Sequence, residues 1–429
     1  MYRQEHLKEL LDGRRILIAG YGREGRSSHD LITRLCHSAS VTVADGNENI
    51  RREASNGFDM IIKSPGIPMS VFDGCCKRDS ITSQSDIFLQ IYGDQTVGVT
   101  GTKGKSTTST LIHHVLVQSG KHSILAGNIG IPLFDIIPQI DSATTVVAEL
   151  SCHQLESIHR GPHIAVLLNL FQEHLDHYRD YLDYQMAKMQ IGLQQREDDY
   201  FFYSSDNSDL NARVTENRTA LRSHVQPFNL DSALQSPLHD LQSPLAGNHN
   251  LTNTFVAWQV TSLLGVDGKQ FASALASFKP LEPRMELVGT VDGVTYYNDS
   301  ISTIPAACIA AVNALPDVAT LIVGGFDRGI DYQPLADFLS GSHISNIAFT
   351  GAAGRRVMSL MRPETINDRN ILVEDDYTKI VAWCASVTPK GASCLLSPAA
   401  ASYDAFKNFE QRGSVFKQLV RSIGDNNVR

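Results

Sequence analysis

The chain alternates short apolar runs with longer stretches in which apolar residues recur at helical spacing. Residues 15–19, 96–100 and 164–168 are such runs, and a polar or glycine-containing loop follows each of them. A short apolar run of this kind is typical of a strand buried on both faces, and the longer stretches are typical of amphipathic helices. Their alternation predicts an α/β fold built on parallel sheets.

The chain is too long for a single hydrophobic core, because it has 429 residues. Breaks in the pattern fall at residues 93–94 and in the proline-rich run 279–284. We therefore expect three domains, at residues 1–93, 94–280 and 281–429. The outer two are predicted to be Rossmann-like, doubly wound domains, and the central one a P-loop-type ATPase domain with a mostly parallel sheet.

The clearest candidate for chemistry is the run 96–108, Thr-Val-Gly-Val-Thr-Gly-Thr-Lys-Gly-Lys-Ser-Thr-Thr. It predicts a strand, a glycine-broken loop and a helix over residues 106–118. Backbone N–H groups and the helix dipole at such a junction bind phosphate. Lys105 is placed to reach the β- and γ-phosphates of a nucleotide, and either Ser106 or Thr107 can offer a hydroxyl to Mg²⁺. Val99 stands where the strict nucleotide-loop pattern has glycine, so a plain glycine-rich turn is the alternative.

A second glycine-rich turn follows the first predicted strand. It reads Gly20-Tyr-Gly22-Arg-Glu-Gly25, and the next predicted strand ends at Asp45. This is the outline of a dinucleotide-binding fingerprint. The glycines would admit any nucleotide diphosphate, and the rest of the chain supplies no nicotinamide chemistry, so NAD is only one of the candidates.

Polar residues follow other predicted strands. Glu149 lies at the end of the strand predicted over 144–148, where a Mg²⁺ ligand beside a phosphate loop is expected; a surface glutamate is the alternative. His174 follows the next strand, and both a structural and a functional role are open for it. Lys188 lies in a helix predicted over 181–193, and from the sequence alone it would be a solvated cation.

Composition excludes some classes of partner. The chain is 42% hydrophobic and 19% charged, with a formal net charge of −9. We expect no nucleic-acid partner, because phosphate contacts need clustered Lys and Arg. No apolar run approaches the ~20 residues that span a bilayer, so we expect no membrane partner. The seven cysteines show no Cys-x-x-Cys spacing and the N-terminus lacks an apolar signal core, which favours a cytoplasmic protein without structural zinc.

A series of motifs over essentially the whole chain resembles the Mur ligase family, the ATP-dependent amino-acid ligases of peptidoglycan synthesis. In the family's order the motifs are Gly-x-Thr-Gly-Thr-x-Gly-Lys-Ser-Thr, Gly-Asn-Ile-Gly, Glu-Leu-Ser, Asn-x-x-x-x-His-Leu-Asp, Gly-x-His-Asn and Pro-x-Arg-Met-Glu. Within the family, residues 396–413 are most similar to the members that join D-glutamate to UDP-N-acetylmuramoyl-L-alanine.

The resemblance implies a reaction and its cofactors. ATP would phosphorylate the muramoyl-alanine carboxylate to an acyl phosphate, and the amine of D-glutamate would displace the phosphate. The implied cofactors are ATP and two Mg²⁺ ions. Lys188 corresponds to a lysine that this family carbamylates. We give this implication more weight than the interpretation of Lys188 as a solvated cation. The resemblance also implies a monomer.

The resemblance further implies roles for individual residues. Catalysis and metal binding would involve Lys105, Glu149, His174 and Lys188, with Ser106 as a further metal ligand. ATP would be held by Gly101, Thr102, Lys103, Gly104, Lys105, Ser106, Thr107, Asn250, Arg284 and Asp299. The UDP-linked substrate would contact Gly22, Arg23, Ser64, Pro65, Gly66, Asn128 and Ser151. D-Glutamate would contact Thr303, Arg328, Ser402 and Phe409.

Several positions depart from the family pattern. Ile301 stands where many members have lysine, and Arg328 corresponds to a lysine elsewhere; an arginine would grip a carboxylate with two hydrogen bonds. Lys103 stands where Asn is frequent, and residues 45–47 lack a Thr-Arg pair that some relatives use on UDP. Rival hypotheses are a ligase of the same family that adds another amino acid, a nucleotide switch that hydrolyses ATP, and a nicotinamide enzyme.

Overall fold

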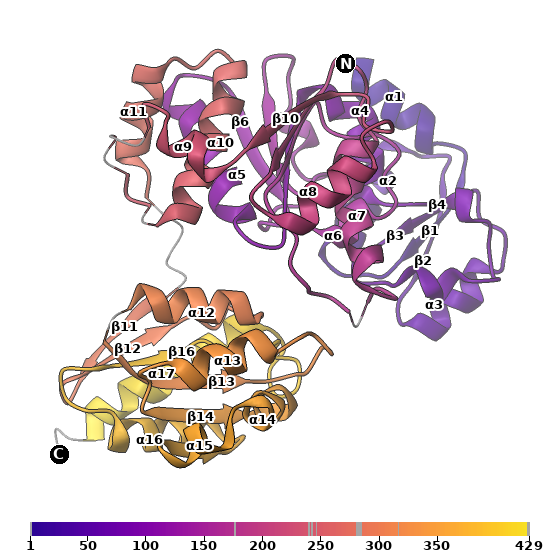
Figure 1. Cartoon of the computed structure of the whole chain (residues 1–429). Helices are drawn as coiled ribbons and strands as arrows, with labels where there is room; N and C mark the ends of the chain where they lie inside the picture. Colours follow the sequence, from indigo (N-terminus) through magenta and orange to yellow (C-terminus); the bar gives the residue numbers. More distant parts are fainter. Residues whose placement is uncertain are drawn as a thin grey trace. The chain divides into compact units, whose positions relative to one another are not determined.

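The structure is a computed structural model that describes residues 2–175, 177–238, 241, 243–245, 247–279, 285–315 and 317–426. The chain forms two compact units (Figure 1). The first comprises Met1–Phe171 and His177–Leu281, and the second comprises Gln172–Asp176 and Glu282–Arg429. Both are α/β structures, as the alternation of apolar runs and amphipathic stretches predicts.

The first unit opens with a small parallel sheet in the order β2-β1-β3-β4. Its strands are β1 (Arg15–Ala19), β2 (Ser40–Ala44), β3 (Met60–Lys63) and β4 (Ile81–Thr82). The accompanying helices are α1 (Tyr2–Leu11), α2 (Arg23–Leu35), α3 (Asn47–Ala54) and α4 (Gln84–Tyr92). The apolar residues of β1 are fully buried because α2 and α3 pack against this central strand.

The second sheet of this unit has six parallel strands in the order β10-β9-β8-β5-β7-β6. They are β5 (Thr96–Thr100), β6 (Ser123–Gly127), β7 (Thr145–Glu149), β8 (Ile164–Leu167), β9 (Tyr200–Ser204) and β10 (His224–Phe228). The helices are α5 (Lys105–Gln118), α6 (Cys152–Leu155), α7 (Tyr181–Leu193), α8 (Ser208–Glu216), α9 (Leu230–Leu234), α10 (Asn248–Leu263) and α11 (Gly268–Ser277). The sheet places the phosphate-loop strand β5 between β7 and β8, in its interior.

The second unit contains a six-stranded sheet in the order β11-β12-β16-β13-β14-β15. Its strands are β11 (Glu286–Val291), β12 (Val294–Asn298), β13 (Val318–Gly324), β14 (Asn346–Thr350), β15 (Asn370–Val373) and β16 (Ser393–Leu396). Only β11 and β12 pair in the antiparallel sense among the strands described. The helices are α12 (Pro305–Ala314), α13 (Gln333–Gly341), α14 (Gly351–Leu360), α15 (Pro363–Asn367), α16 (Tyr377–Val387) and α17 (Phe409–Asn426).

The expected fold class is confirmed, and two local expectations need correction. The sequence predicts a polar loop region with short strands over residues 200–244; the short strands β9 and β10 are present, but the helices α8 and α9 lie between and after them. The sequence also predicts the start of a helix over residues 399–409, but α17 begins only at Phe409. Ala399 has a φ of 56°, and the carbonyls of Ala400 and Ala401 accept hydrogen bonds from Arg412. The three-domain division stays a prediction, and most of its second boundary lies outside the described residues.

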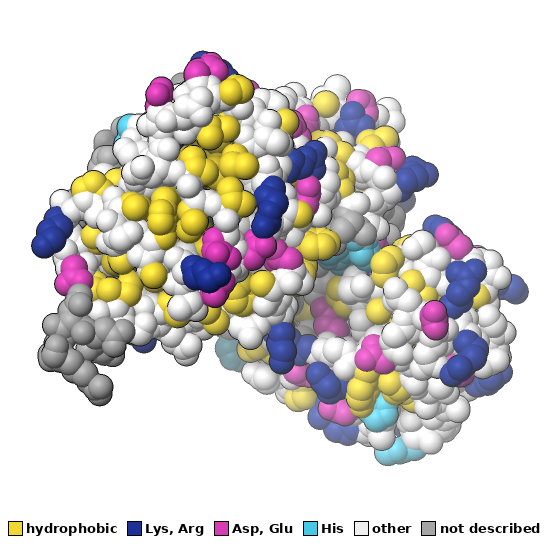
Figure 2. Space-filling view, turned by 90° about the horizontal axis from the view of Figure 1, so that it is seen from below, with side chains coloured by type: hydrophobic (Ala, Val, Ile, Leu, Met, Phe, Trp, Pro, Cys, Tyr) yellow, Lys and Arg dark blue, Asp and Glu magenta, His cyan; other side chains and the backbone are white. Residues whose placement is uncertain are grey.

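None of the helices in the described ranges is long and apolar enough to cross a bilayer. On the face drawn in Figure 2, lysine and arginine side chains are interspersed with aspartate and glutamate. Mixed charge of this kind is ordinary for a globular protein surface.

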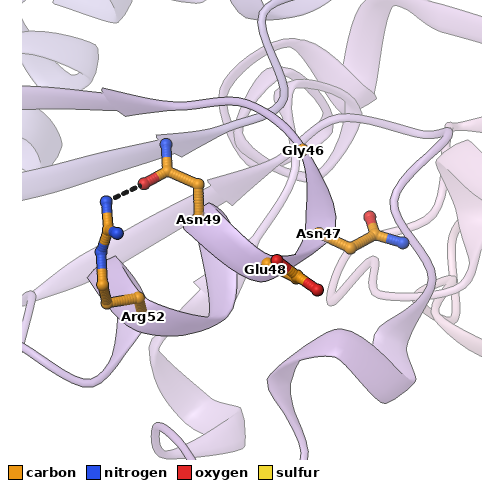
Figure 3. Close-up of a pocket in the computed structure, with 5 residues that line it drawn as sticks. All are labelled: Gly46, Asn47, Glu48, Asn49 and Arg52. Atoms are coloured by element: carbon orange, nitrogen blue, oxygen red, sulfur yellow. Dashed lines mark hydrogen bonds between the residues drawn. The ribbon is translucent and has the colours of Figure 1, made fainter.

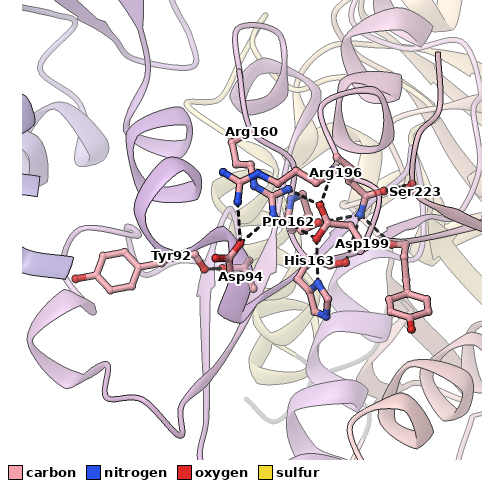
Figure 4. A network of polar contacts seen from close by, with 11 residues as sticks. Tyr92, Asp94, Arg160, Pro162, His163, Arg196, Asp199 and Ser223 are labelled. Carbon is pink, nitrogen blue, oxygen red and sulfur yellow. Dashed lines mark hydrogen bonds and ion pairs between the residues drawn. The ribbon is translucent and has the colours of Figure 1, made fainter. Parts of the chain in front are cut away.

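A buried charge network joins the amino-terminal ends of neighbouring strands in the six-stranded sheet of the first unit (Figure 4). Arg160 Nη1 lies 2.5 Å from Asp199 Oδ2, and its Nη2 lies 2.9 Å from Asp94 Oδ1. His163 Nδ1 is 2.9 Å from Asp199 Oδ1. Burial by itself raises the pKa of Asp199, but the hydrogen bonds from His163 and Arg160 outweigh it, so that pKa lies below its ordinary value.

The first prediction concerns this network. Arg160→Met leaves the Asp199 carboxylate buried beside fewer partners, and we expect a loss of roughly 3–5 kcal/mol in the free energy of unfolding at neutral pH. The loss should shrink as the pH falls below about 4, because protonated Asp199 no longer needs a cation. Urea denaturation followed by circular dichroism measures both effects.

The matched control is Arg179→Met, which removes an exposed ion pair with Asp183. An exposed pair contributes roughly 0.2–1 kcal/mol, so this variant should unfold close to the unmodified chain. Equal destabilisation by the two substitutions would contradict the importance assigned to the buried network.

Candidate active site

The loop between β5 and α5 has the shape that the sequence predicts. Gly101 and Gly104 have φ values of 151° and 86°, a backbone conformation that favours glycine. A Cβ atom on Gly104 would also lie 3.1 Å from Asn253 Nδ2 of α10, so a larger residue would have to displace this side chain. The N-terminus of α5 therefore opens directly onto a glycine-shaped loop, as a phosphate site requires.

A single asparagine holds this loop in place from the neighbouring strand. Asn169, just after β8, accepts a hydrogen bond from the Lys103 N–H at 2.8 Å and donates one to the Lys103 carbonyl at 3.0 Å. Its own carbonyl accepts from the Thr102 N–H at 3.0 Å. These bonds fix the path of the backbone, and Ser106 and Thr107 follow in the first turn of α5.

Two lysines converge on one carbonyl of this loop. Lys105 Nζ donates to the carbonyls of Gly101 and Thr102 at 3.0 and 3.1 Å. Lys188 Nζ, from α7, donates to the same Gly101 carbonyl at 3.0 Å. The Lys188 side chain is also 5.1 Å from the centre of the Tyr184 ring.

Lys188 is 2% exposed, so its interpretation from the sequence alone as a solvated cation is wrong. Lys188 is buried because of a tertiary contact: α7 packs beside β5 and places the Lys188 side chain next to the phosphate loop. A buried ammonium close to a second one is unfavourable, and any modification that removes the charge of Lys188 would relieve the repulsion.

Glu149 is buried at the end of β7 rather than exposed, so the surface alternative is also wrong. It is 2% exposed and pairs in the sheet with Val99, shortly before the phosphate loop. Its Oε1 accepts a hydrogen bond from Asn128 Nδ2 at 2.7 Å, whereas its Oε2 is buried without a hydrogen-bond partner among the described residues. A buried carboxylate with one unused oxygen beside a phosphate loop fits a Mg²⁺ ligand.

A cavity of about 340 Å³ opens in the first unit, where the loops after β1, β3 and β6 meet. All residues predicted to contact the UDP end except Ser151 line it, namely Gly22, Arg23, Ser64, Pro65, Gly66 and Asn128. Arg23 Nη1 donates to the Gly130 carbonyl at 2.8 Å, and Ser64 Oγ donates to the Gly20 carbonyl at 2.8 Å. Ser151 instead caps the start of α6 through Gln154. Two carboxylates also line the cavity: Asp45, the acidic residue of the fingerprint outlined by the sequence, and Glu24, which was not predicted.

A second hollow, of about 680 Å³, lies at the start of α3 (Figure 3). It is lined by Gly46, Asn47, Glu48, Asn49 and Arg52, and Arg52 Nη2 donates to Asn49 Oδ1 at 2.6 Å. This hollow lies where the family's Thr-Arg pair is absent from the sequence. The structure assigns it no ligand.

In the second unit, a glutamate that was not predicted joins two residues of the expected amino-acid site. Thr303 Oγ1 donates to Glu173 Oε1 at 2.8 Å, and Arg328 Nη1 lies 3.7 Å from the same oxygen. The Arg328 guanidinium also lies 5.6 Å from the centre of the Tyr403 ring. The sequence offers no signal for Glu173 beyond its place after a strand, because its partners are far along the chain.

The remaining predicted residues of this unit are placed near strand ends. Asp299 is buried and its Oδ2 accepts from Ser397 Oγ at 2.7 Å. Ser402 is buried, and the Phe409 carbonyl accepts from Ser300 Oγ at 2.8 Å. His174 has a φ of 60° and belongs to the same unit. Roles for Asp299 on ATP and for His174 on a metal therefore stay predictions.

Two other residues, Asn250 and Arg284, are predicted to contact the nucleotide. Asn250 lies in the first turn of α10, one helical turn before the Asn253 that packs against Gly104. This places Asn250 on the helix that borders the phosphate loop. Arg284, the other predicted contact, lies outside the described residues.

The sequence gives no indication of the structural role of Arg412. Arg412 is 1% exposed, and its guanidinium donates to Ser300 Oγ and to the carbonyls of Ser300, Ala400 and Ala401, at 2.8–3.2 Å. One side chain thereby ties the loop after β12 to the loop after β16. These loops carry Thr303 and Ser402, so Arg412 sets the shape of the expected amino-acid site without belonging to it.

Comparison with known proteins gives concordant findings. Residues 99–261 match the Mur ligase middle domain family. A UDP-N-acetylmuramoylalanine--D-glutamate ligase of Geotalea uraniireducens is 31% identical over 458 residues, covering 97% of this chain and 99% of the relative. A UDP-N-acetylmuramoyl-L-alanine--L-glutamate ligase of Salinispora tropica is 32% identical, with 96% and 98% covered.

The fold itself recurs in solved structures. A MurF ligase from Thermotoga maritima, in complex with ADP, matches with a TM-score of 0.58 and 18% identity, over 97% of this chain and 97% of that one. At this level of identity the match shows a common fold. It agrees with the α/β architecture that the apolar pattern predicts.

The second prediction concerns Arg412. Arg412→Met removes the donors that hold residues 300–303 and 400–402 together, and we expect amide hydrogen exchange in both loops to rise by about tenfold or more. Arg421→Met, which removes an exposed arginine of the same helix, is the control and should leave both loops unchanged. Hydrogen exchange read by mass spectrometry measures the difference. Unchanged protection in Arg412→Met would show that the loops hold their shape without it.

Proposed function

This chain belongs to the Mur ligase family, and we propose that it uses ATP to join D-glutamate to UDP-N-acetylmuramoyl-L-alanine. The observation that carries the proposal is the phosphate loop with Lys105 and Lys188 on one carbonyl. In addition, this chain matches relatives over nearly their full length, and most of these relatives are named for this reaction. A ligase driven by ATP must hold the phosphates of the nucleotide, and a loop of this kind does so.

In the first step, the alanine carboxylate of the substrate attacks the γ-phosphorus of ATP, and the bond from that phosphorus to ADP breaks. The N–H groups of residues 101–107 hold the phosphates, and Lys105 exchanges the Gly101 and Thr102 carbonyls for phosphate oxygens. The product is an acyl phosphate, which is a far better electrophile than a carboxylate.

In the second step, the deprotonated amine of glutamate attacks the acyl carbon, and inorganic phosphate leaves with the bonding electrons. The amine proton passes to solvent. We assign Thr303, Arg328, Ser402 and Phe409 to the amino acid, with Glu173 fixing Thr303 and Arg328. A guanidinium matches the geometry of a carboxylate, so Arg328 suits an acidic amino acid.

Mg²⁺ is proposed as the cofactor because the donor set fits it. Glu149 offers a buried oxygen with no other described partner, Ser106 offers a hydroxyl, and a carbamate on Lys188 would add a further oxygen ligand. His174 is assigned to the second ion. When bound, Mg²⁺ neutralises charge on the transferring phosphate.

The location is also a proposal. The seven cysteines are all free, and most are buried, as expected of a protein kept in a reducing compartment such as the cytoplasm. The monomeric state stays a prediction.

A second candidate function is the addition of L-glutamate. The Salinispora tropica relative carries that name at 32% identity. Ile301 and Arg328 also depart from the lysines that the resemblance to D-glutamate-adding members leads us to expect. Both enantiomers carry the same two carboxylates and amine, so the same residues would hold either one, and the two differ only in the handedness with which these groups are arranged.

The third prediction tests the function directly. Purified protein with ATP, Mg²⁺ and UDP-N-acetylmuramoyl-L-alanine should release phosphate only when glutamate is added, with D-glutamate preferred over its enantiomer. Lys105→Ala should lower the rate by about a thousandfold, because it removes a cation from the transferring phosphate. Preference for L-glutamate would establish the second candidate. Phosphate release that ignores both acceptor and amino acid would refute ligation.

The fourth prediction concerns Lys188. Lys188→Ala should lower the ligation rate by about a hundredfold or more, and short carboxylic acids such as acetate should restore part of it if a carbamate is the working group. Lys188→Met, which refills the buried volume, serves as the control and should not respond to acetate. A rate in Lys188→Ala equal to that of the unmodified chain would remove the lysine from the mechanism.

A further inference from the structure

Glu24 is a carboxylate in the wall of a cavity that we assign to an anionic ligand. It lies in the first turn of α2 and lines the 340 Å³ cavity of the first unit, beside the glycine-rich turn after β1. Helix starts and glycine turns of this kind bind diphosphates. A negative side chain at this position opposes such binding, and the mechanism above gives it no task.

The hydrogen bonds around Glu24 determine where it can carry a proton. Gln154 Oε1 accepts from the Ser151 N–H at 2.9 Å, which turns the amide nitrogen of Gln154 toward Glu24. That nitrogen donates to Glu24 Oε1 at 2.6 Å, so Oε1 is an acceptor in either protonation state. Oε2 is buried and has no hydrogen-bond partner among the described residues. A proton on Glu24 therefore belongs on Oε2.

The charges around Glu24 are mostly engaged elsewhere. Lys63 of β3 pairs with Glu156 at 2.5 Å, and Glu156 lies 3.3 Å from His177.

Arg23 of α2 donates to the Gly130 carbonyl, and Asp45, after β2, accepts from the Tyr21 N–H at 3.4 Å. Asp135 accepts from Ser27 of α2. No cation of the described residues forms an ion pair with Glu24 at contact distance.

Burial raises the pKa of Glu24 to about 7, against the opposing effects of the Gln154 hydrogen bond and of the Lys63 and Arg23 charges. At neutral pH the side chain is thus divided between its neutral and ionised forms. A ligand that brings negative charge into the cavity favours the neutral form further, because like charges disfavour ionisation.

We propose that binding of the UDP-linked substrate is coupled to the uptake of one proton by Glu24 on Oε2. The proton comes from solvent, and it removes the repulsion between the carboxylate and the diphosphate of the ligand. The inference rests on the proposed function, because that function identifies the ligand as UDP-N-acetylmuramoyl-L-alanine. It assigns to this chain a pH dependence of substrate affinity that originates in one side chain.

The fifth prediction follows from this coupling. The dissociation constant of UDP-N-acetylmuramoyl-L-alanine should rise up to tenfold per pH unit above about pH 7, because deprotonated Glu24 must first take up a proton. In Glu24→Gln the dependence should disappear, since the amide mimics the neutral acid. At about pH 8 this variant should bind the ligand about tenfold more tightly than the unmodified chain.

Isothermal titration calorimetry measures the proton directly. Binding is recorded without ATP or glutamate, in two buffers of different ionisation enthalpy, from about pH 6 to about pH 8.5. The diphosphate diester and the alanine carboxylate of the ligand stay ionised throughout this range, and the uracil N3–H stays protonated near neutral pH, so a proton taken up near neutral pH belongs to the protein. Glu9→Gln makes the same substitution at an exposed site of α1 and should behave as the unmodified chain does.

Gln154→Met provides a variant that leaves Glu24 in place. It removes the hydrogen bond that lowers the pKa of Glu24, so the midpoint of the pH dependence should move to higher pH. Uptake that vanishes in Glu24→Gln, or a midpoint that moves in Gln154→Met, supports the inference. Binding without proton uptake in the unmodified chain, or uptake that persists in Glu24→Gln, overturns it. Absence of binding at every pH overturns the proposed function instead.

Discussion

The convergence of two ammonium groups on the Gly101 carbonyl is the constraint on which the catalytic chemistry depends. Lys105 comes from the helix that begins at the phosphate loop, and Lys188 comes from α7 and lies 87 residues beyond Gly101 in the sequence. Like charges so close together in a buried site are costly. The arrangement becomes favourable when Lys105 turns to phosphate or when Lys188 carries a negative group, and both changes belong to the proposed reaction.

In the first unit, the charge network that stabilises the fold lies at the amino-terminal ends of the strands, and the residues proposed for binding and catalysis lie at the carboxyl ends. At the amino-terminal ends, Arg160, Asp94, Asp199 and His163 are joined to one another, and no carboxylate oxygen in this network is left buried without a partner among the described residues. At the carboxyl ends, Glu149 and Glu24 each keep one buried oxygen without a described partner. Unsatisfied buried oxygens cost free energy, and they are tolerated where a ligand or a proton can complete them.

Local features of the fold could be predicted from the sequence, and long-range ones could not. The strand, loop and helix around Lys105 and the bounds of α7 follow from apolar spacing, glycine placement and helix-end signals. The burial of Lys188, the pairing of Thr303 with Glu173 and the loops tied by Arg412 depend on contacts between residues 87, 130 and 112 positions apart. No periodicity within one element carries that information. The predicted helix start over residues 399–409 is wrong for the same reason, because the carbonyls of Ala400 and Ala401 accept hydrogen bonds from the distant Arg412.

Two of the departures from the family pattern, Ile301 and Arg328, concern the expected amino-acid site rather than the residues proposed for activation. Lys105, Ser106, Glu149 and Lys188 match the residues that the resemblance implies for the proposed acyl-phosphate step. Arg328 differs from lysine in kind, because its planar guanidinium is oriented both by Glu173 at 3.7 Å and by the face of Tyr403. A fixed plane selects the direction from which a carboxylate approaches, whereas an ammonium group accepts many directions. On the proposed assignment, Arg328 holds a carboxylate of glutamate in the plane that Glu173 and Tyr403 fix, and this orientation contributes to the choice between the two enantiomers.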